Sequence, residues 1–217
     1  LEFKYWNIKN ELPKYKKLIS QFRSLDNTTT VDDIDDIYQQ GILLGNNSRD
    51  FFLPQIVEFC KTITNKQVEE MATYFDALMK ERKLELENDD EDFQGSLTKS
   101  FKRFFRFMGV KLNNEQTNKI QILSSGIEDR RGKLISERIE WNQKFIAILN
   151  LRQNENFEEI FISHINSLDS EDPKTRILIN QITAEIIASL DEKQRGKFQK
   201  RLSRFEASID QIIKEQS

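Results

Sequence analysis

Apolar residues recur along most of the chain at alternating intervals of three and four positions. This spacing is typical of α-helices that bury one stripe of side chains against their neighbours. The first stripe continues through Pro13, which must either kink one helix or begin a new one. The third stripe predicts one helix of roughly 40 residues. The four clearest stripes are Tyr5, Ile8, Leu12, Tyr15, Ile19 and Phe22; Val68, Met71, Phe75, Leu78, Arg82 and Leu86; Ile120, Leu123, Ile127, Leu134, Trp141, Phe145 and Ile148; and Phe198, Leu202, Phe205, Ile209 and Ile212.

Three helix starts can be recognised from a repeated pattern of an apolar residue, a capping residue and a glutamine three positions after the cap. The capping side chain accepts a hydrogen bond from a first-turn backbone N–H, and the glutamine side chain returns to the cap. Caps of this kind contribute about 1 kcal/mol each. The pattern occurs at residues 63–67, 112–116 and 190–194, with Thr64, Asn113 and Asp191 as the caps.

Short polar breaks separate the stripes, and short connections favour antiparallel neighbours. The breaks fall at 26–30, 45–50, 88–92, 109–111, 152–156 and 170–173. Only 7 glycines and 3 prolines occur among the 217 residues, and strand-like alternation is absent. The sequence therefore predicts an all-α antiparallel helical bundle of about seven or eight helices, including one long helix.

The polar break at 152–156 contains no apolar side chain. We therefore expect residues 1–150 to form one helical bundle and residues 151–217 to form C-terminal helices packed on the same core. The sequence contains no run of about 20 apolar residues of the kind that spans a bilayer. Because the chain starts at Leu1, a signal peptide or a lipid-attachment cysteine would lie upstream of it.

The chemistry-bearing residues are few and scattered. His164 is the only histidine and lacks the preceding glutamate of a helical di-iron site, so we expect an ordinary helix residue near a C-terminus. Cys60, the only cysteine, is expected to be a buried small apolar residue. No two glycines fall close enough to form a phosphate loop. The sequence thus predicts no catalytic, cofactor-binding or metal site, no cofactor and no small-molecule substrate.

Cations and aromatic residues alternate between Lys99 and Met108. The favoured interpretation is a core helix that buries Phe101, Phe104, Phe105 and Met108 while its cations extend outward. A second interpretation is a surface that contacts a partner. Nucleic-acid stacking is the third, although one short basic helix offers little electrostatic attraction in a chain of net charge -3. The candidate partner-contacting residues are Lys102, Arg103, Arg106 and Phe107.

Two further charge runs have simple explanations. The acidic run at 85–92 lacks the alternating ligands and the turn glycine of an EF-hand loop, so a solvated loop is expected. The last helix carries a positive face, which is expected to be a solvated surface and alternatively to contact an anionic partner. The cations of that face are Lys193, Arg195, Lys197, Lys200, Arg201 and Arg204.

The segment from Trp6 to Leu18 contains Glu11-Leu12-Pro13-x-Tyr15, and in this the chain resembles a family of uncharacterised proteobacterial lipoproteins. Weaker likeness lies in the aromatic segment ending at Gly109, in the helix start at 112–116, and in Arg138 with Trp141. The likeness covers roughly residues 1–150. It implies a helical fold, export by a signal peptide and a lipid anchor on a cysteine upstream of Leu1. It implies no activity, because the family has no known catalytic residues.

We therefore expect a non-enzymatic helical domain of a bacterial cell-envelope lipoprotein, on the periplasmic side, that acts through protein–protein contacts. A periplasmic chaperone-like protein that binds unfolded clients is an alternative, and would need an exposed apolar surface. A cytoplasmic or secretion-system scaffold is another, and residues upstream of Leu1 would distinguish it. An enzyme with an unrecognised carboxylate site would need a pocket holding a strongly perturbed Asp or Glu.

Overall fold

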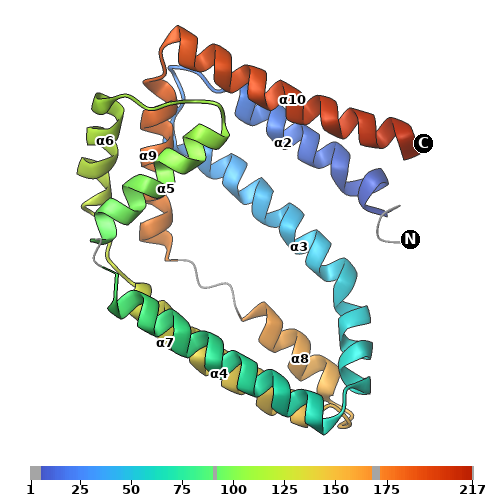
Figure 1. The fold of residues 1–217 in the computed structure, drawn as a ribbon. Helices are drawn as coiled ribbons and strands as arrows, with labels where there is room; N and C mark the ends of the chain where they lie inside the picture. Colours follow the sequence, from blue (N-terminus) through green and yellow to red (C-terminus); the bar gives the residue numbers. More distant parts are fainter. Residues whose placement is uncertain (1–5, 90–91, 168–171, 217) are drawn as a thin grey trace. The chain divides into compact units, whose positions relative to one another are not determined.

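The computed structural model describes residues 6–89, 92–167 and 172–216, and these form nine α-helices and one π-helical turn, with no strand (Figure 1). The all-α prediction is confirmed. None of the described helices combines the length and the apolar character that crossing a membrane requires. The elements are η1 (Asn7–Glu11), α2 (Leu12–Ser24), α3 (Val31–Thr62), α4 (Asn65–Glu87), α5 (Phe93–Phe107), α6 (Asn114–Ser124), α7 (Arg131–Asn150), α8 (Phe157–Asn166), α9 (Pro173–Ala188) and α10 (Glu192–Gln216).

The chain folds into two packed units that alternate along the sequence. The first unit combines residues 1–51, 93–128 and 172–217, and the second combines residues 52–92 and 129–171. Helix α3 contributes its first part to the first unit and its last part to the second. These units are groups of packed helices, and the sequence-based division at residue 150 stays a prediction.

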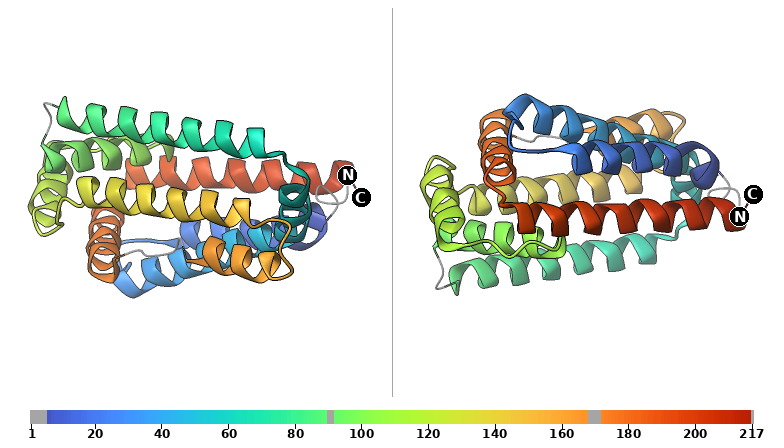
Figure 2. Two further views of the ribbon diagram at one scale, coloured as in Figure 1. Left: turned by 90° about the horizontal axis from the view of Figure 1, so that it is seen from below. Right: turned by 90° about the horizontal axis from the view of Figure 1, so that it is seen from above.

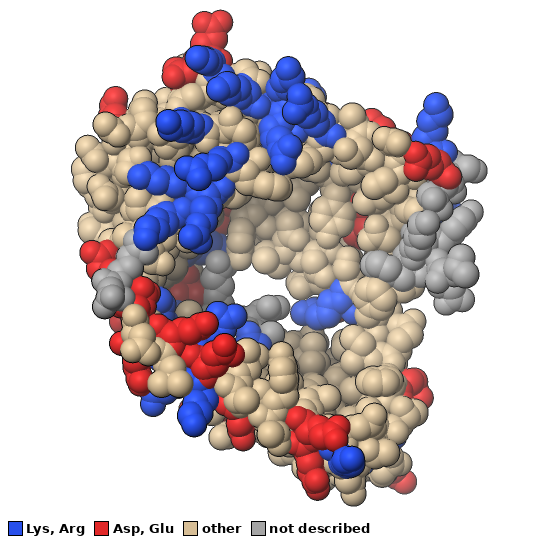
Figure 3. All heavy atoms as spheres, in the orientation of Figure 1, with Lys and Arg blue, Asp and Glu red and all other residues tan. Residues whose placement is uncertain are grey.

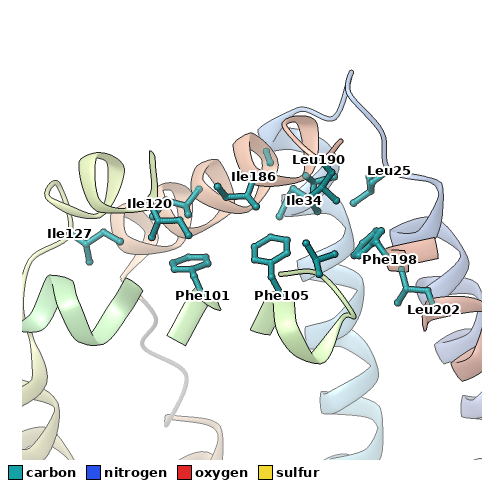
Figure 4. Packing of buried hydrophobic residues seen from close by; sticks show 14 residues of the cluster. Leu25, Ile34, Phe101, Phe105, Ile120, Ile127, Ile186, Leu190, Phe198 and Leu202 are labelled. Carbon is teal, nitrogen blue, oxygen red and sulfur yellow. The ribbon is translucent and has the colours of Figure 1, made fainter. Parts of the chain in front are cut away.

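In the first unit, α2 and α10 lie side by side and antiparallel (Figure 2), and α6 packs against both α5 and α9. Pro13 stands in the first turn of α2, directly after the π-helical turn, and the backbone stays helical across the junction at Glu11. The core of this unit takes its buried side chains from α3, α5, α6, α9 and α10 and from the connections beside them, as Figure 4 shows. Ile19 and Phe22 of α2 pack against this core. Its most deeply buried side chains include Phe105, Ile120, Ile182, Ile186, Ile187, Phe198 and Leu202.

In the second unit, α4 packs along α7, and α8 packs against α7. Cys60 is buried in this core, as expected, and burial raises the pKa of its thiol. His164 lies in the last turn of α8, also as expected. Its ring stacks on Trp141 with centroids 4.5 Å apart, and each of these two side chains bonds the other residue's backbone carbonyl. The only histidine is therefore a packing residue that joins α8 to α7.

All three predicted capping patterns form. Thr64 and Asn113 make complete capping boxes with Gln67 and Gln116. Asp191 and Gln194 exchange the same pair of hydrogen bonds at the start of α10. These caps are local interactions, which explains why the sequence alone indicates them.

Two predictions of helix boundaries are wrong. The stripe from Ile120 to Ile148 belongs to two helices, α6 and α7, because its first residues join the core of the first unit, whereas Phe145 and Ile148 pack against the core of the second. A turn after Ser124 separates them. The break expected at 45–50 is helical, since α3 continues through Gly45 and Pro54 for 32 residues. The long helix of the fold is therefore α3. The breaks at 88–92 and 170–173 lie partly outside the described residues.

Candidate partner-binding surface

Helix α5 buries one face and exposes another. Phe101 and Phe105 are 9% and 0% exposed and belong to the core, as the favoured interpretation predicts. Phe104 is 37% exposed and marks the edge of the buried face, so its full burial was not a correct expectation. Phe107 is 57% exposed and stands beside the exposed cations of the same helix. The helix thus contributes to the core on one face and exposes an aromatic ring among cations on another.

Helix α10 divides its charges between two sides. Lys197, Lys200 and Arg204 are exposed at helical spacing, on the side away from the buried Phe198 and Leu202. The acidic side chains Glu206 and Asp210 pair with Arg23 and Lys16 of α2. These two carboxylates of α10 are therefore paired with cations of α2, and they do not neutralise the exposed cations of α10.

Arg195 does not belong to the exposed positive face to which the sequence assigned it. Its guanidinium donates to the backbone carbonyls of Leu25, Ile187 and Leu190, at distances between 3.2 and 3.3 Å. Two of these carbonyls lie at the end of α9, where a cation is favoured by the unpaired C=O groups. Arg195 therefore holds three chain segments together.

The cations of α5 and α10 meet around a hollow of about 440 Å³. Apart from Gly109, the described residues that line it are all cationic or aromatic. Figure 3 shows the Lys and Arg side chains gathered over α5 and the start of α10. The lining residues are Arg106, Phe107, Gly109, Lys197, Lys200, Arg201 and Arg204. We call these residues, together with Lys102 and Arg103, the basic surface.

Gly109 allows the chain after α5 to approach α10 closely. Its φ is +84°, and a Cβ atom added there would lie 3.3 Å from the carbonyl oxygen of Lys197. A left-handed backbone of this kind suits glycine and strains other residues. The glycine therefore holds the end of α5 against the cationic side of α10.

Arg201 is held rigidly at the centre of the basic surface. Its guanidinium lies 5.3 Å from the ring centroid of Phe107 and 4.7 Å from that of Phe205, and the two rings stack 5.6 Å apart. Its Nε donates to the carbonyl of Phe107 at 3.1 Å. The terminal nitrogens have no partner among the described residues. A guanidinium fixed in this way can bind a carboxylate through two parallel hydrogen bonds at little cost in side-chain entropy.

Seven cations of the basic surface have no ion-pair partner in the part of the chain that the structure describes, although the protein contains more acidic than basic residues. Like charges held close together repel one another, and a bound anion would relieve that repulsion. The described residues contain no group of three or more His, Cys, Asp or Glu side chains that could hold a metal ion. The surface can therefore bind anions. The seven cations are Lys102, Arg103, Arg106, Lys197, Lys200, Arg201 and Arg204.

The structure brings together two segments that the sequence analysis treated separately. Arg106 and Phe107, from the candidate partner-contacting set, line the same hollow as four cations of the last helix. Lys102 and Arg103 are exposed on the same helix as Arg106. Sequence reasoning missed Phe205, whose helical spacing indicated only a core position. No local signal links positions about 100 residues apart, so their meeting could not be foreseen.

A family model described as "Family of unknown function (DUF6279)" matches residues 1–172. The match covers most of the chain, including α5 and the whole of the second unit. The chain therefore belongs to this family. Neither the curated proteins nor the solved structures give a match.

Proposed function

We propose that this member of a family of unknown function is a non-enzymatic domain of a bacterial cell-envelope lipoprotein that binds another protein through its basic surface. The observation that carries the proposal is the group of seven cations, without carboxylate partners among the described residues, around the exposed ring of Phe107. An acidic segment of a partner protein would neutralise these charges. The function of the domain would then be to connect that partner to the membrane.

The composition of the basic surface favours a protein over other anionic partners. Aromatic residues and arginine are enriched where proteins bind one another, and here Arg201 stacks on Phe107. The chain as a whole has a net charge of -3, which repels long polyanions such as nucleic acids. A short acidic segment experiences mainly the local positive field, because salt screens charges more than about 10 Å away.

The cellular location is proposed from the likeness of the Glu11-Leu12-Pro13-x-Tyr15 segment to lipoproteins. The test is mass spectrometry of the N-terminal peptide of the full-length protein isolated from cells. A lipid-modified cysteine ahead of Leu1 would support the proposal. An unprocessed chain that begins with methionine would contradict it and favour a cytoplasmic scaffold.

Binding through the basic surface can be tested by crosslinking in living cells. A photoreactive amino acid at Phe107 should crosslink to one defined protein, and the charge reversals Lys200→Glu and Arg204→Glu should abolish that product. Lys83→Glu is the matched control, because Lys83 is an exposed helical lysine outside the basic surface. Crosslinking that survives both reversals would contradict the proposed role of these cations.

A further inference from the structure

An apolar groove lies beside the basic surface in the first unit. It has a volume of about 430 Å³ and is formed by side chains of α2, α3, α5 and α9. Its polar lining groups already have partners: Asn180 donates to Asp35, and the hydroxyl of Thr183 donates to the carbonyl of Ile179. The groove therefore suits apolar side chains. Residues that line it include Phe22, Ile37, Leu97, Ser100, Phe104 and Ile179.

One row of residues on α5 connects the groove to the basic surface. Ser100, Phe104 and Phe107 follow one another at intervals of four and three, so they lie along one side of the helix. Ser100 and Phe104 line the groove, whereas Phe107 lines the cationic hollow. Arg103 is a neighbour of both Ser100 and Phe107 by the same spacing rule. Apolar and cationic binding areas are therefore continuous along α5.

We infer that the partner segment is an acidic amphipathic helix, with apolar side chains in the groove and carboxylates against Arg103, Arg106 and the cations of α10. The inference rests on the proposed function, since it specifies what the basic surface binds. A helix has a broad apolar stripe directly beside its polar face, so it can contact both areas at once. An extended segment directs alternate side chains to opposite sides, so about half of its side chains would point away from α5.

The test uses three synthetic peptides of equal length and the complete chain. The first peptide repeats leucine at helical spacing with glutamate elsewhere. The second has the same composition with leucine and glutamate in strict alternation, and the third contains glutamate without leucine. Dissociation constants measured by fluorescence anisotropy should be at least tenfold lower for the first peptide than for the other two.

Two sets of variants separate the groove from the charges. Ser100→Trp fills the groove without removing a cation. It should lower the affinity for the first peptide at least tenfold and leave the affinity for the all-glutamate peptide unchanged. Ser136→Trp is the matched control, because both serine hydroxyls are exposed and bond the carbonyl four residues earlier. Ser100→Leu provides a smaller obstruction if the tryptophan variant unfolds. The double variant Arg106→Glu/Arg204→Glu should lower the affinity for every peptide.

The outcomes distinguish the inference from the proposed function. Equal binding of the first two peptides, or an unchanged affinity in both Ser100 variants, overturns the amphipathic helix and leaves the acidic partner standing. If the charge reversals change the affinity for none of the peptides, both the inference and the proposed function are overturned. Binding to vesicles that contain phosphatidylglycerol, with no binding to any peptide, overturns both in favour of a membrane surface. Suppression of aggregation of an unfolded protein that survives the charge reversals favours a chaperone and also overturns both.

Discussion

The side chains of Gln116 and Gln194 link two capping boxes through a buried pair of amides, which makes their energetic coupling measurable. Each Nε2 donates to the other Oε1, at 2.9 and 3.0 Å. Each Oε1 also accepts from the backbone N–H of its own cap, Asn113 or Asp191. Gln116 is 2% exposed and Gln194 is 9% exposed, so water cannot replace a lost partner easily. The perturbation is Gln116→Leu, which keeps the approximate volume and removes the amide.

The expected cost follows from the bonds that are lost. Gln116→Leu removes both amide–amide bonds, the bond to the Asn113 N–H and the bond to the Ser189 carbonyl. It also leaves the buried Gln194 amide with unsatisfied groups. At about 1 kcal/mol per bond, with part of the loss relieved by the apolar replacement, the free energy of unfolding should fall by about 3 kcal/mol. Gln67→Leu is the matched control, and should cost only about 1 kcal/mol because its capping box is exposed.

The assay is urea unfolding followed by circular dichroism for the single variants Gln116→Leu and Gln194→Leu and for the double variant Gln116→Leu/Gln194→Leu. The double variant has no stranded amide, so its cost should fall short of the sum of the two single costs by about 1–2 kcal/mol. Costs that add to within about 0.5 kcal/mol would show that the two amides are independent. That result would refute the argument that the pair acts as one unit.

Three further expectations concern other parts of the chain. Arg152→Met should destabilise the protein by about 3 kcal/mol in urea unfolding, because the guanidinium donates to the buried carbonyls of Ile63 and Leu149, which would lose their partner. Gly109→Ala should cost about 1–2 kcal/mol in the same assay, since alanine is strained at positive φ, and an unchanged midpoint would contradict this. The backbone N–H and hydroxyl of Thr30 lower the pKa of Asp33 below 3.8, so its stabilising contribution is present above pH 3.8 and is lost as the pH falls through the lowered pKa. Thermal unfolding followed against pH should therefore show a smaller acid-induced loss in Asp33→Asn than in the unchanged chain.

Helix starts were predictable because their determinants lie within four residues of one another. Thr64, Asn113 and Asp191 carry the information for their own caps, and no distant residue has to be known. The burial of Phe198 and Leu202 was predictable for a similar reason, since helical spacing alone places them on one face. For Pro13 the sequence left a helix kink and a helix start open, and the structure places it in the first turn of α2.

The sequence did not predict the features that depend on which of the two hydrophobic cores a side chain packs into. Ile120 and Phe145 continue one apolar rhythm, yet Ile120 is buried in the core of the first unit and Phe145 packs against the core of the second, and the rhythm contains no sign of the turn between them. The polar residues at 45–50 suggested a loop, whereas packing of Leu44 and Leu53 on either side keeps α3 helical. The basic surface belongs to the same class, because α5 and α10 meet only through tertiary packing.

The pairing of α2 with α10 has a consequence for the order in which the protein can be made. Arg23 of α2 bonds Ser203 of α10 across 180 positions of sequence, so α2 leaves the ribosome long before its partner does. All segments of the second unit are synthesised before α10, and that unit can assemble first. Until α10 appears, Ile19 and Phe22 of α2 lack the helix that covers them. The nascent chain therefore carries an uncovered apolar surface on α2 until α10 has been synthesised, and the first unit can be completed only after that point.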